Sequence, residues 1–354
     1  MGIVTEVSMA KTKMGNMSRR EFVIMSGGVI GGLGMIGALG KPLGAEEVPG
    51  GQEKVKAMPK TRVALVRAND RKTGVRKAVE LLAIATCKGK NVLVKPNFNT
   101  SDPTPGSTHN DTLRELLALI KEMGGKNLTI ADRSGPEPTP EVLKKKGIHE
   151  LAAEFSAKVL DLDEMGPDGY RRFDPPGSHW QNGFLAARAV AEAECVVSTC
   201  CLKTHQYGGH FTMSLKNSVG IVPRKGQPYM KELHSSPNQR KMIAEINTAY
   251  SPALIVLDGL EAFVDGGPMA GTKKTANVFL AGIDRVAVDA VAVAILQELG
   301  SNATIMGRKA FAHEQIARAA ELGLGVSTPE AIEIVTADAE SEGFASRIRK
   351  VLSA

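Results

Sequence analysis

The sequence predicts an α/β fold with a mainly parallel sheet and helices on both of its faces. Short runs of β-branched residues, such as Arg62–Val66, alternate along the chain with segments of helical periodicity. In the clearest helical segment, Leu113, Leu116 and Leu117 fall on one face. Gly124 then stands where a helix of this length ends. Because alternating strands and helices need crossover connections, the strands should pair in parallel.

The other elements follow from the same two patterns. Apolar β-branched runs predict strands at 62–66, 91–94, 128–131, 158–162, 195–198, 254–257, 278–281 and 332–335. Apolar residues at helical spacing predict helices at 75–87, 111–123, 141–155, 185–193, 239–249, 286–299, 308–322 and 341–352. Two stretches rich in Pro, Gly and polar residues are interpreted as long functional loops or small insertions, at 165–183 and 223–237. We expect one α/β domain over residues 61–354.

The N-terminus has the pattern of a twin-arginine export signal. Arg19 and Arg20 precede an uncharged run that ends at Leu39 and contains six glycines. We expect a signal peptide at 1–45, with Ala38–Gly40 as the alternative cleavage site, and a flexible leader at 46–60.

The uncharged run is just long enough to span a bilayer. Its glycines make it weakly hydrophobic, which favours cleavage over retention as an anchor, and no stable membrane span is expected after cleavage. Export by the twin-arginine machinery carries folded proteins, so we expect a periplasmic or other extracytoplasmic location.

The charge balance argues against a nucleic-acid partner. The chain has 44 Lys and Arg against 38 Asp and Glu, a net charge of +6. Residues 1–45 hold five basic and two acidic side chains, so the remainder carries +3. Aromatic residues make up only 4% of the chain, and no basic stripe is interleaved with them.

The four cysteines, Cys87, Cys195, Cys200 and Cys201, are interpreted as small buried residues. Along an extended strand, Cys195 and Cys200 would stand about 16 Å apart, too far for a disulfide. A bridge from Cys87 has no support in the sequence, although an oxidising compartment would allow one. Because the chain has no CxxCxxC run, we expect no iron–sulphur cluster.

Polar residues follow several of the expected strands directly. They are Lys95, Asn97, Asp132, Lys203, Thr204, His205, Asp258 and Asp284. Ligands of open α/β sheets bind at the carboxyl ends of the strands, so this shared placement favours one site over separate solvated loop residues. His205, Asp132 and Asp258 are the candidate catalytic residues, since imidazole and carboxylate groups carry acid–base chemistry.

Two segments pose a choice between anion binding and an ordinary structural role. Thr108 and His109 stand at the start of the helix at 111–123, where free N–H groups attract an anion. Thr108 or Asn110 could instead cap that helix, which is the more common role of such residues. In Ser214–Asn217, Lys216 could neutralise a phosphate or a carboxylate, or face water.

Three lysines near the expected strand ends, Lys95, Lys203 and Lys216, favour a small anionic ligand. The candidate substrate-binding residues are Lys95, Asn97, Thr108, His109, Lys203, Thr204, Lys216 and Asn217. We expect one cleft to be lined by Asn97, His109, Asp132, Lys203, His205, Lys216 and Asp258.

Two further carboxylates are assigned supporting roles. Asp284 is expected to cap the helix at 286–299. Asp289 has apolar neighbours on every face of that helix, where an unpartnered carboxylate is costly to bury. Either a Lys or Arg pairs with it, or it supports the site.

A divalent metal is compatible with the sequence without being required by it. His205 and His210 could ligate zinc or a similar ion together with a carboxylate. Their spacing across Gly208 and Gly209 is more typical of a flexible loop. The sequence contains no P-loop, GxSxG or HExxH motif.

In these motifs the chain resembles the domain-of-unknown-function 362 family. The matching segments are Val94–Asn97, Thr108–His109, Lys203–His205, Ser214–Asn217, Gly267–Pro268, Ala270–Thr272 and Asp284–Val291. They occur in the family's order and cover most of residues 62–300. An acid that members carry before the Gly-Pro pair stands one position earlier here, at Asp265. Some members carry a ferredoxin-like segment, but that iron–sulphur association does not transfer to a chain without CxxCxxC.

The sequence favours an extracytoplasmic enzyme that acts on a small anionic substrate, with or without a divalent metal. The alternative is a non-catalytic protein that binds a metal, a cofactor or an anion, for instance in maturation. An iron–sulphur electron-transfer protein comes third, because it needs at least three converging cysteines. Strongly shifted pKa values for His205 and an acid in one pocket would favour the enzyme.

Changing Arg19 and Arg20 together to Lys should leave the precursor in the cytoplasm, because the export signal depends on the arginine pair. Cell fractionation measures this, and N-terminal sequencing should find wild-type mature protein beginning near Glu46. Normal export of the double-lysine variant would contradict the twin-arginine interpretation.

Overall fold

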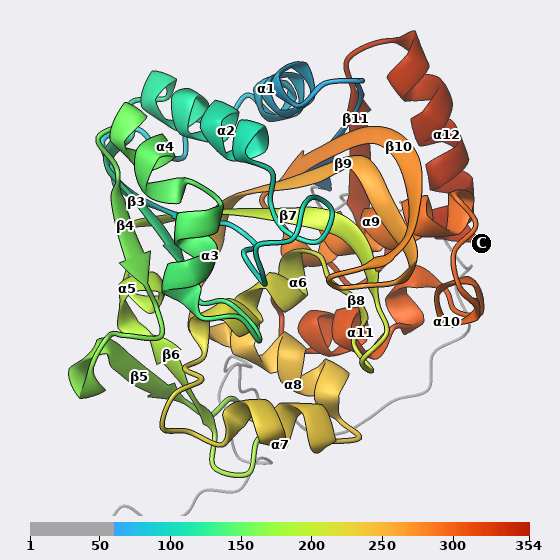
Figure 1. Ribbon diagram of the computed structural model, residues 1–354. Helices are drawn as coiled ribbons and strands as arrows, with labels where there is room; N and C mark the ends of the chain where they lie inside the picture. Colours follow the sequence, from blue (N-terminus) through green and yellow to red (C-terminus); the bar gives the residue numbers. More distant parts are fainter. Residues whose placement is uncertain (1–59) are drawn as a thin grey trace, which may run out of the picture. The chain divides into compact units, whose positions relative to one another are not determined.

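The computed structural model describes residues 60–354, and in this part of the chain one sheet of nine strands organises the fold (Figure 1). The strands are β1 (Thr61–Arg67), β2 (Asn91–Lys95), β3 (Lys126–Asp132), β4 (Lys158–Asp161), β7 (Cys195–His205), β8 (His210–Phe211), β9 (Pro252–Gly266), β10 (Gly271–Gly282) and β11 (Ile332–Thr336). Their order is β11-β1-β10-β9-β7-β2-β3-β4, and β8 pairs with β7.

The sheet is mainly parallel, as the sequence predicted. Parallel pairing joins β4, β3, β2, β7 and β9 in turn, and also joins β1 to β11. β10 is antiparallel to both of its neighbours, and a short connection rather than a helix joins it to β9. The parallel strands end along one edge, where Lys95 closes β2 and Asp132 closes β3.

Helices cover both faces of the sheet, again as predicted (Figure 1). One face packs against α1 (Arg71–Leu82), α2 (Asn110–Glu122), α3 (Thr139–Lys145) and α4 (Ile148–Glu154). The other packs against α6 (Ser214–Asn217), α9 (Arg285–Glu298), α10 (Ala303–Met306), α11 (Glu314–Glu321) and α12 (Ala339–Ser353). In β1, Ala64 and Val66 face the first group while Val63 and Leu65 face the second, which is the alternation of a strand buried on both sides.

The stretch 165–183, expected to be a loop or a small insertion, contains a strand. β5 (Tyr170–Phe173) pairs antiparallel with β6 (Phe184–Ala187) in a separate two-stranded sheet. This hairpin is held by aromatic packing, since the ring of Trp180 lies 5.6 Å from that of Phe184. Buried apolar side chains therefore order a segment whose composition indicated a loop.

Two further segments next to this hairpin differ from the secondary structure that the sequence predicted. The helix expected at 185–193 is reduced to α5 (Arg188–Ala191), because β6 uses its first residues. The expected loop 223–237 contains α7 (Tyr229–Ser235), which packs with α8 (Gln239–Ile246) and the β5–β6 hairpin in a third apolar cluster.

β7 and β9 are much longer than the strands expected at 195–198 and 254–257. They pair with each other as far as Lys203 and Phe263, and β9 continues in a hairpin with β10. Polar residues within β7 made its second half look like a loop, but the whole strand is buried. Lys203, Thr204 and His205 therefore lie inside β7, and Asp258 lies inside β9, instead of following them.

The helix expected at 141–155 is broken into α3 and α4. Gly147 separates them with a φ of +62°, which favours glycine. The helix expected at 308–322 begins only at Glu314, and α1 begins at Arg71, where Asp70 accepts a hydrogen bond from the N–H of Thr73.

The expected export signal and its cleavage site lie outside the described residues. Within residues 60–354, no helix combines the length and the apolar character needed to cross a bilayer.

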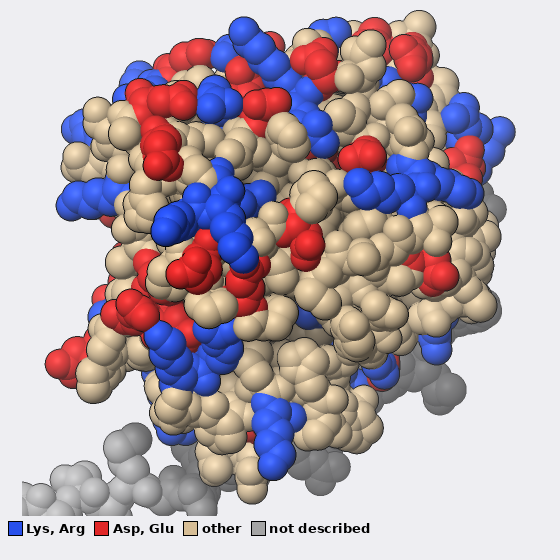
Figure 2. All heavy atoms as spheres, in the orientation of Figure 1, with Lys and Arg blue, Asp and Glu red and all other residues tan. Residues whose placement is uncertain are grey.

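Charged side chains of both signs intermingle on the molecular face in Figure 2. Lys and Arg stand beside Asp and Glu there, without an extended stripe of one sign among the residues drawn in colour. The lysines singled out in the sequence, by contrast, are buried: Lys95, Lys203 and Lys216 all lie in the interior. These three lysines are therefore candidates for an interior site, not for a charged surface.

Changing Gly74 to Ala should destabilise the protein, although alanine normally strengthens a helix. A Cβ at Gly74 in α1 would lie 2.1 Å from the ring of Phe279 in β10, so the added methyl group overpacks the core. We expect a loss of about 1–3 kcal/mol in the free energy of unfolding, measured by urea denaturation.

Gly343→Ala is the matched control, because a Cβ at Gly343 in α12 would meet nothing within 4 Å. This variant should gain roughly 0.5–1 kcal/mol. Equal effects of the two substitutions would show that helix propensity, and not contact with Phe279, decides the result.

Candidate functional site

A polar chamber lies at the carboxyl ends of β2 and β3, against α6. Its volume is about 40 Å³, room for a few water molecules or one small polar group. It is lined by Lys95, Asn97, Asn99, Asp132, Arg133, Gly135, His205, Thr212, Lys216, Asn217, Val219, Gly220 and Pro268. We call it the inner chamber.

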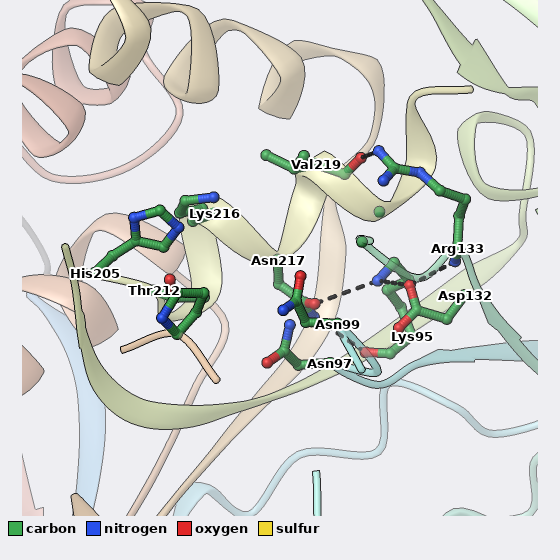
Figure 3. Close-up of a pocket in the computed structure, with 13 residues that line it drawn as sticks. Lys95, Asn97, Asn99, Asp132, Arg133, His205, Thr212, Lys216, Asn217 and Val219 are labelled. Carbon is green, nitrogen blue, oxygen red and sulfur yellow. Dashed lines mark hydrogen bonds and ion pairs between the residues drawn. The ribbon is translucent and has the colours of Figure 1, made fainter. Parts of the chain in front are cut away.

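An outer chamber of about 370 Å³ adjoins the inner one and shares much of its wall, including His205 and Lys216. Its further lining residues are Pro136, Tyr207, Arg224, Met230, His234 and Met269. Figure 3 shows His205 and Lys216 together at one end of the inner chamber, with Lys95 and Asp132 at the other. A ligand can therefore place a small polar group inside and a larger, less polar part outside.

A buried ion pair closes one end of the inner chamber. Lys95 Nζ lies 2.5 Å from Asp132 Oδ1, and both side chains are almost fully buried. The N–H groups of Phe98 and Arg133 also donate to this carboxylate, at 2.6 and 2.7 Å. Burial raises the pKa of Asp132 and lowers that of Lys95, while their mutual attraction opposes both shifts. Asp132 thus uses its oxygens to join two strand ends.

Asn217 and Gly220 complete this end of the chamber. Asn217 Oδ1 accepts from Lys95 Nζ at 3.2 Å, and its Nδ2 donates to Ser198 Oγ at 3.0 Å. A Cβ at Gly220 would lie 2.5 Å from Asp132 Oδ1 and 2.7 Å from Lys95 Nζ. Glycine at this position therefore lets the turn after α6 approach the ion pair.

Lys203 is buried but is bound by neutral oxygens. Its Nζ donates to Asn97 Oδ1 at 2.8 Å, to the carbonyl of Gly106 at 2.5 Å and to that of Pro268 at 3.3 Å. Burial lowers its pKa to about 8. Lys203 therefore fastens together three segments behind the chamber, and it adds a positive charge that no carboxylate among residues 60–354 neutralises by contact.

Lys216 is the lysine that faces the chamber without a partner. Within the described residues its ammonium makes no ion pair and no hydrogen bond, although the side chain is only 9% exposed. Burial, together with the positive charges of Lys203 and Arg133, lowers the pKa of Lys216 to about 7. This side chain is therefore poised to exchange a proton near neutral pH.

His205 stands next to Lys216. Burial and the adjacent Lys216 hold the pKa of His205 well below its usual range, so its imidazole is neutral. Its Nδ1 has no hydrogen-bond partner in the described part of the chain, and neither does Thr212 Oγ1 nearby. Buried polar atoms of this kind are normally satisfied by water or a ligand.

Asp289 positions the segment that carries Lys216. Its two carboxylate oxygens accept hydrogen bonds from the N–H groups of Ser214 and Leu215, at 2.8 and 2.9 Å. Of the two roles considered for Asp289, the structure thus shows contact with the start of α6, and among residues 60–354 it shows no Lys or Arg ion pair. Burial raises the pKa of Asp289 to about 7.

The expected cleft contains Asn97, Asp132, His205 and Lys216, but Asp258 lies elsewhere. Because β9 continues past Asp258, this side chain meets α1 and α2, where it accepts from Arg71 Nε at 2.8 Å and Thr112 Oγ1 at 2.6 Å. Lys203 lies behind the chamber wall.

The other expected substrate-binding residues hold the surrounding structure. His109 also lies outside both chambers. It caps α2, because its Nδ1 accepts a hydrogen bond from the N–H of Asp111. Thr108 Oγ1 accepts from the N–H of Asn97 at 2.9 Å, and Thr204 Oγ1 donates to the carbonyl of Phe263 at 3.3 Å. Asp284 caps α9 by accepting from two backbone N–H groups.

Metal ligation was left open by the sequence. Within residues 60–354, no three His, Cys, Asp or Glu side chains converge in a way that could hold a metal ion. The inner chamber instead gathers hydrogen-bond donors, namely Lys216, the amides of Asn97 and Asn99, and the hydroxyl of Thr212.

Sequence reasoning missed several lining residues. Asn99 and Arg133 stand one or two positions beyond residues that were singled out, so extending each strand-end motif would have included them. Thr212 and Gly220 flank the α6 segment in the same way. The outer-chamber residues Met230 and His234 lie in 223–237, which was interpreted as functional, but no motif singled out these two side chains.

The fold and the chamber define an α/β protein with a buried, cation-rich pocket at the carboxyl edge of its sheet. The chain belongs to the family of the domain of unknown function DUF362, whose sequence pattern matches residues 92–294. That range includes Lys95, Asp132, His205, Lys216 and Asp289.

Two known proteins are similar to this chain. Over 214 residues it is 28% identical to the thylakoid-associated protein sll1697 of Synechocystis sp. (strain ATCC 27184 / PCC 6803 / Kazusa), a match that spans 59% of this chain and 64% of that protein, somewhat under two thirds of its length. The structure of the lactate racemase apoprotein from Thermoanaerobacterium thermosaccharolyticum aligns over 80% of this chain and 85% of that one, with 13% identity and a TM-score of 0.41.

Lys95→Met and Lys216→Met should have opposite effects on stability, although both remove a buried lysine. Lys95→Met leaves Asp132 buried without its cation and should cost about 3–5 kcal/mol in the free energy of unfolding. Lys216→Met removes a charge that has no partner among the described residues, and should be neutral or stabilising at pH 7.

The pH dependence separates the two roles further. The pKa of Lys216 is about 7 in the folded protein and near 10.5 when unfolded, so the unfolded chain binds more protons between these values. Loss of the Lys216 proton should therefore raise the wild-type free energy of unfolding by up to about 1.4 kcal/mol per pH unit over pH 7–10. This contribution should be absent from Lys216→Met. Urea denaturation at several pH values measures it; an unchanged slope in Lys216→Met would contradict the assignment.

Proposed function

We propose that this protein is an enzyme that binds a small anionic substrate in the inner chamber and uses Lys216 and His205 for proton transfer. The observation that carries the proposal is the unpartnered, buried ammonium of Lys216, which lines both chambers. A buried charge is costly unless an opposite charge faces it. A carboxylate or phosphate of the substrate would supply that charge.

The charges around the chamber support an anion over a cation. Lys95 is matched by Asp132, but Lys203 and Lys216 have no acidic partner within the described residues. Arg133, which also lines the chamber, is fastened to the carbonyls of Val222 and Val219 and adds a further positive charge. The net field inside the chamber is therefore positive.

The two shifted groups could divide the proton transfer between them. A bound anion would favour the protonated form of Lys216, whose pKa is about 7 without it, and so make this residue the proton donor. His205 is neutral, so its imidazole could accept a proton. Two titratable groups whose surroundings favour different protonation states are typical of acid–base sites.

The shape of the outer chamber supports a substrate of limited size. Met230, Met269 and Tyr207 give it apolar wall, while His234 and Arg224 add polar groups. The substrate would thus carry an anionic group at one end and a small, mostly apolar body at the other.

The alternative is a protein that captures an anion, a cofactor or a metal-bearing ligand without reacting with it. The saturation of Asp132 by Lys95 and two backbone N–H groups favours this alternative, because it removes one expected acid–base residue from the chemistry. Iron–sulphur electron transfer is the least favoured, since no three cysteines converge in the described residues. For either leading function we also propose an extracytoplasmic location, reached by twin-arginine export.

Oxalate should bind the wild-type protein more weakly as the pH rises above about 7, by up to tenfold per unit, because it needs protonated Lys216. Oxalate keeps both carboxylates ionised from pH 6 to 9, so the dependence reports the protein. Isothermal titration calorimetry measures it. Lys216→Met should abolish binding, whereas Lys350→Met, which removes an exposed lysine of α12, should leave it unchanged.

Two outcomes discriminate between the candidate functions. Incubating the protein in D₂O with a panel of small carboxylic acids, followed by NMR, should show deuterium entering one of them next to the carboxylate, and His205→Asn should stop this exchange. Oxalate binding without any exchange would favour the capture protein. Equal oxalate affinity in wild type and Lys216→Met would contradict an anion site at this lysine.

A further inference from the structure

Two cysteines far apart in the sequence meet beneath a surface turn. The Sγ atoms of Cys87 and Cys195 lie 3.6 Å apart. Cys87 belongs to the turn that follows α1, and Cys195 is the first residue of β7. Cys200 and Cys201 lie further along β7, and each is buried. The sequence did not indicate that the thiols of Cys87 and Cys195 are neighbours.

The two thiols differ in acidity. Contact with the Cys195 thiol lowers the pKa of Cys87, with smaller help from Thr86 and Lys90, while burial opposes the shift. The same contact, together with burial, raises the pKa of Cys195. An acidic thiol beside one that stays protonated is the usual arrangement of an attacking and a resolving cysteine.

The residues that follow Cys87 in the sequence are exposed to solvent. It is the single buried residue in the segment 83–90, in which Lys88, Gly89 and Lys90 are all exposed. A small local opening of this turn would uncover its Sγ without unfolding a helix or a strand. Cys200 and Cys201, by contrast, are central residues of a strand that is buried on both sides.

We propose that Cys87 and Cys195 form an intramolecular disulfide when the protein meets a disulfide oxidant. The Cys87 thiolate attacks one sulfur of the oxidant and expels a thiolate, which leaves a mixed disulfide on Cys87. Cys195 then loses its proton and attacks Cys87 Sγ, which expels the second thiolate. The protein loses two electrons and two protons, and the oxidant is reduced to two thiols.

The bond would clamp the turn after α1 to the beginning of β7. This strand carries Lys203 and His205 at its other end, so the clamp acts on an element of the site. Because the linked residues are 108 positions apart, the bond removes much freedom from the unfolded chain. The proposal does not rest on the proposed function, and it holds in whichever compartment supplies the oxidant.

The test treats the purified full chain with oxidised glutathione or with dithiothreitol, then counts thiols after unfolding. We expect four thiols in the reduced protein and two in the oxidised protein, with a cross-linked peptide that contains Cys87 and Cys195 in mass spectrometry. The thermal midpoint should rise on oxidation by on the order of 5 °C.

Variants localise the bond. Cys87→Ser should keep three thiols under both conditions, whereas Cys195→Ser should fall from three thiols to two on oxidation, with glutathione held on Cys87 as an unresolved mixed disulfide. Cys201→Ser is the matched control and should fall from three thiols to one. Four thiols after prolonged oxidation of the wild type, or a cross-link between any other pair of cysteines, would overturn the proposal. An unchanged thermal midpoint in the cross-linked protein would show that the disulfide does not stabilise the fold.

Discussion

The ion pair between Lys95 and Asp132 is the contact on which the site is built. It joins the ends of two parallel strands, and both side chains are almost fully buried, so that either charge alone would be costly. Backbone N–H groups of Phe98 and Arg133 complete the carboxylate, and Asn217 reaches the ammonium from the α6 segment. Each strand end and the turn that faces them are therefore held by the same pair of charges.

The three buried lysines show three ways to accommodate a cation in a protein interior. Lys95 meets a carboxylate, and Lys203 meets an amide oxygen and two carbonyls. Lys216 meets neither among residues 60–354. A protein that keeps such a group gives up stability, which is commonly the cost of a binding or catalytic site. Asp289 maintains the arrangement by holding the first N–H groups of α6, so that Lys216 stays turned toward the chamber.

Much of the fold could be predicted because its signals are local. The period of Leu113, Leu116 and Leu117 defines α2, and the capping role of Asp284 follows from its place before an apolar helix. The lengths of β7 and β9 could not be predicted, because Lys203 and Asp258 are polar and their burial depends on partners distant in the sequence. The β5–β6 hairpin was missed for a related reason, since its order comes from the packing of Trp180 against Phe184.

For the site, the sequence by itself determined the chemical inventory: lysines, asparagines, a histidine and an aspartate at the ends of expected strands, and a carboxylate buried in α9. Only the tertiary structure decided which of them share a chamber. It separated Asp258 and His109 from Lys216 and His205, and it brought Cys87 to Cys195. The physical reason is that strand and helix patterns reflect neighbours a few residues away. The partner of a buried charge or thiol is instead set by strand order and register, which join residues a hundred positions apart.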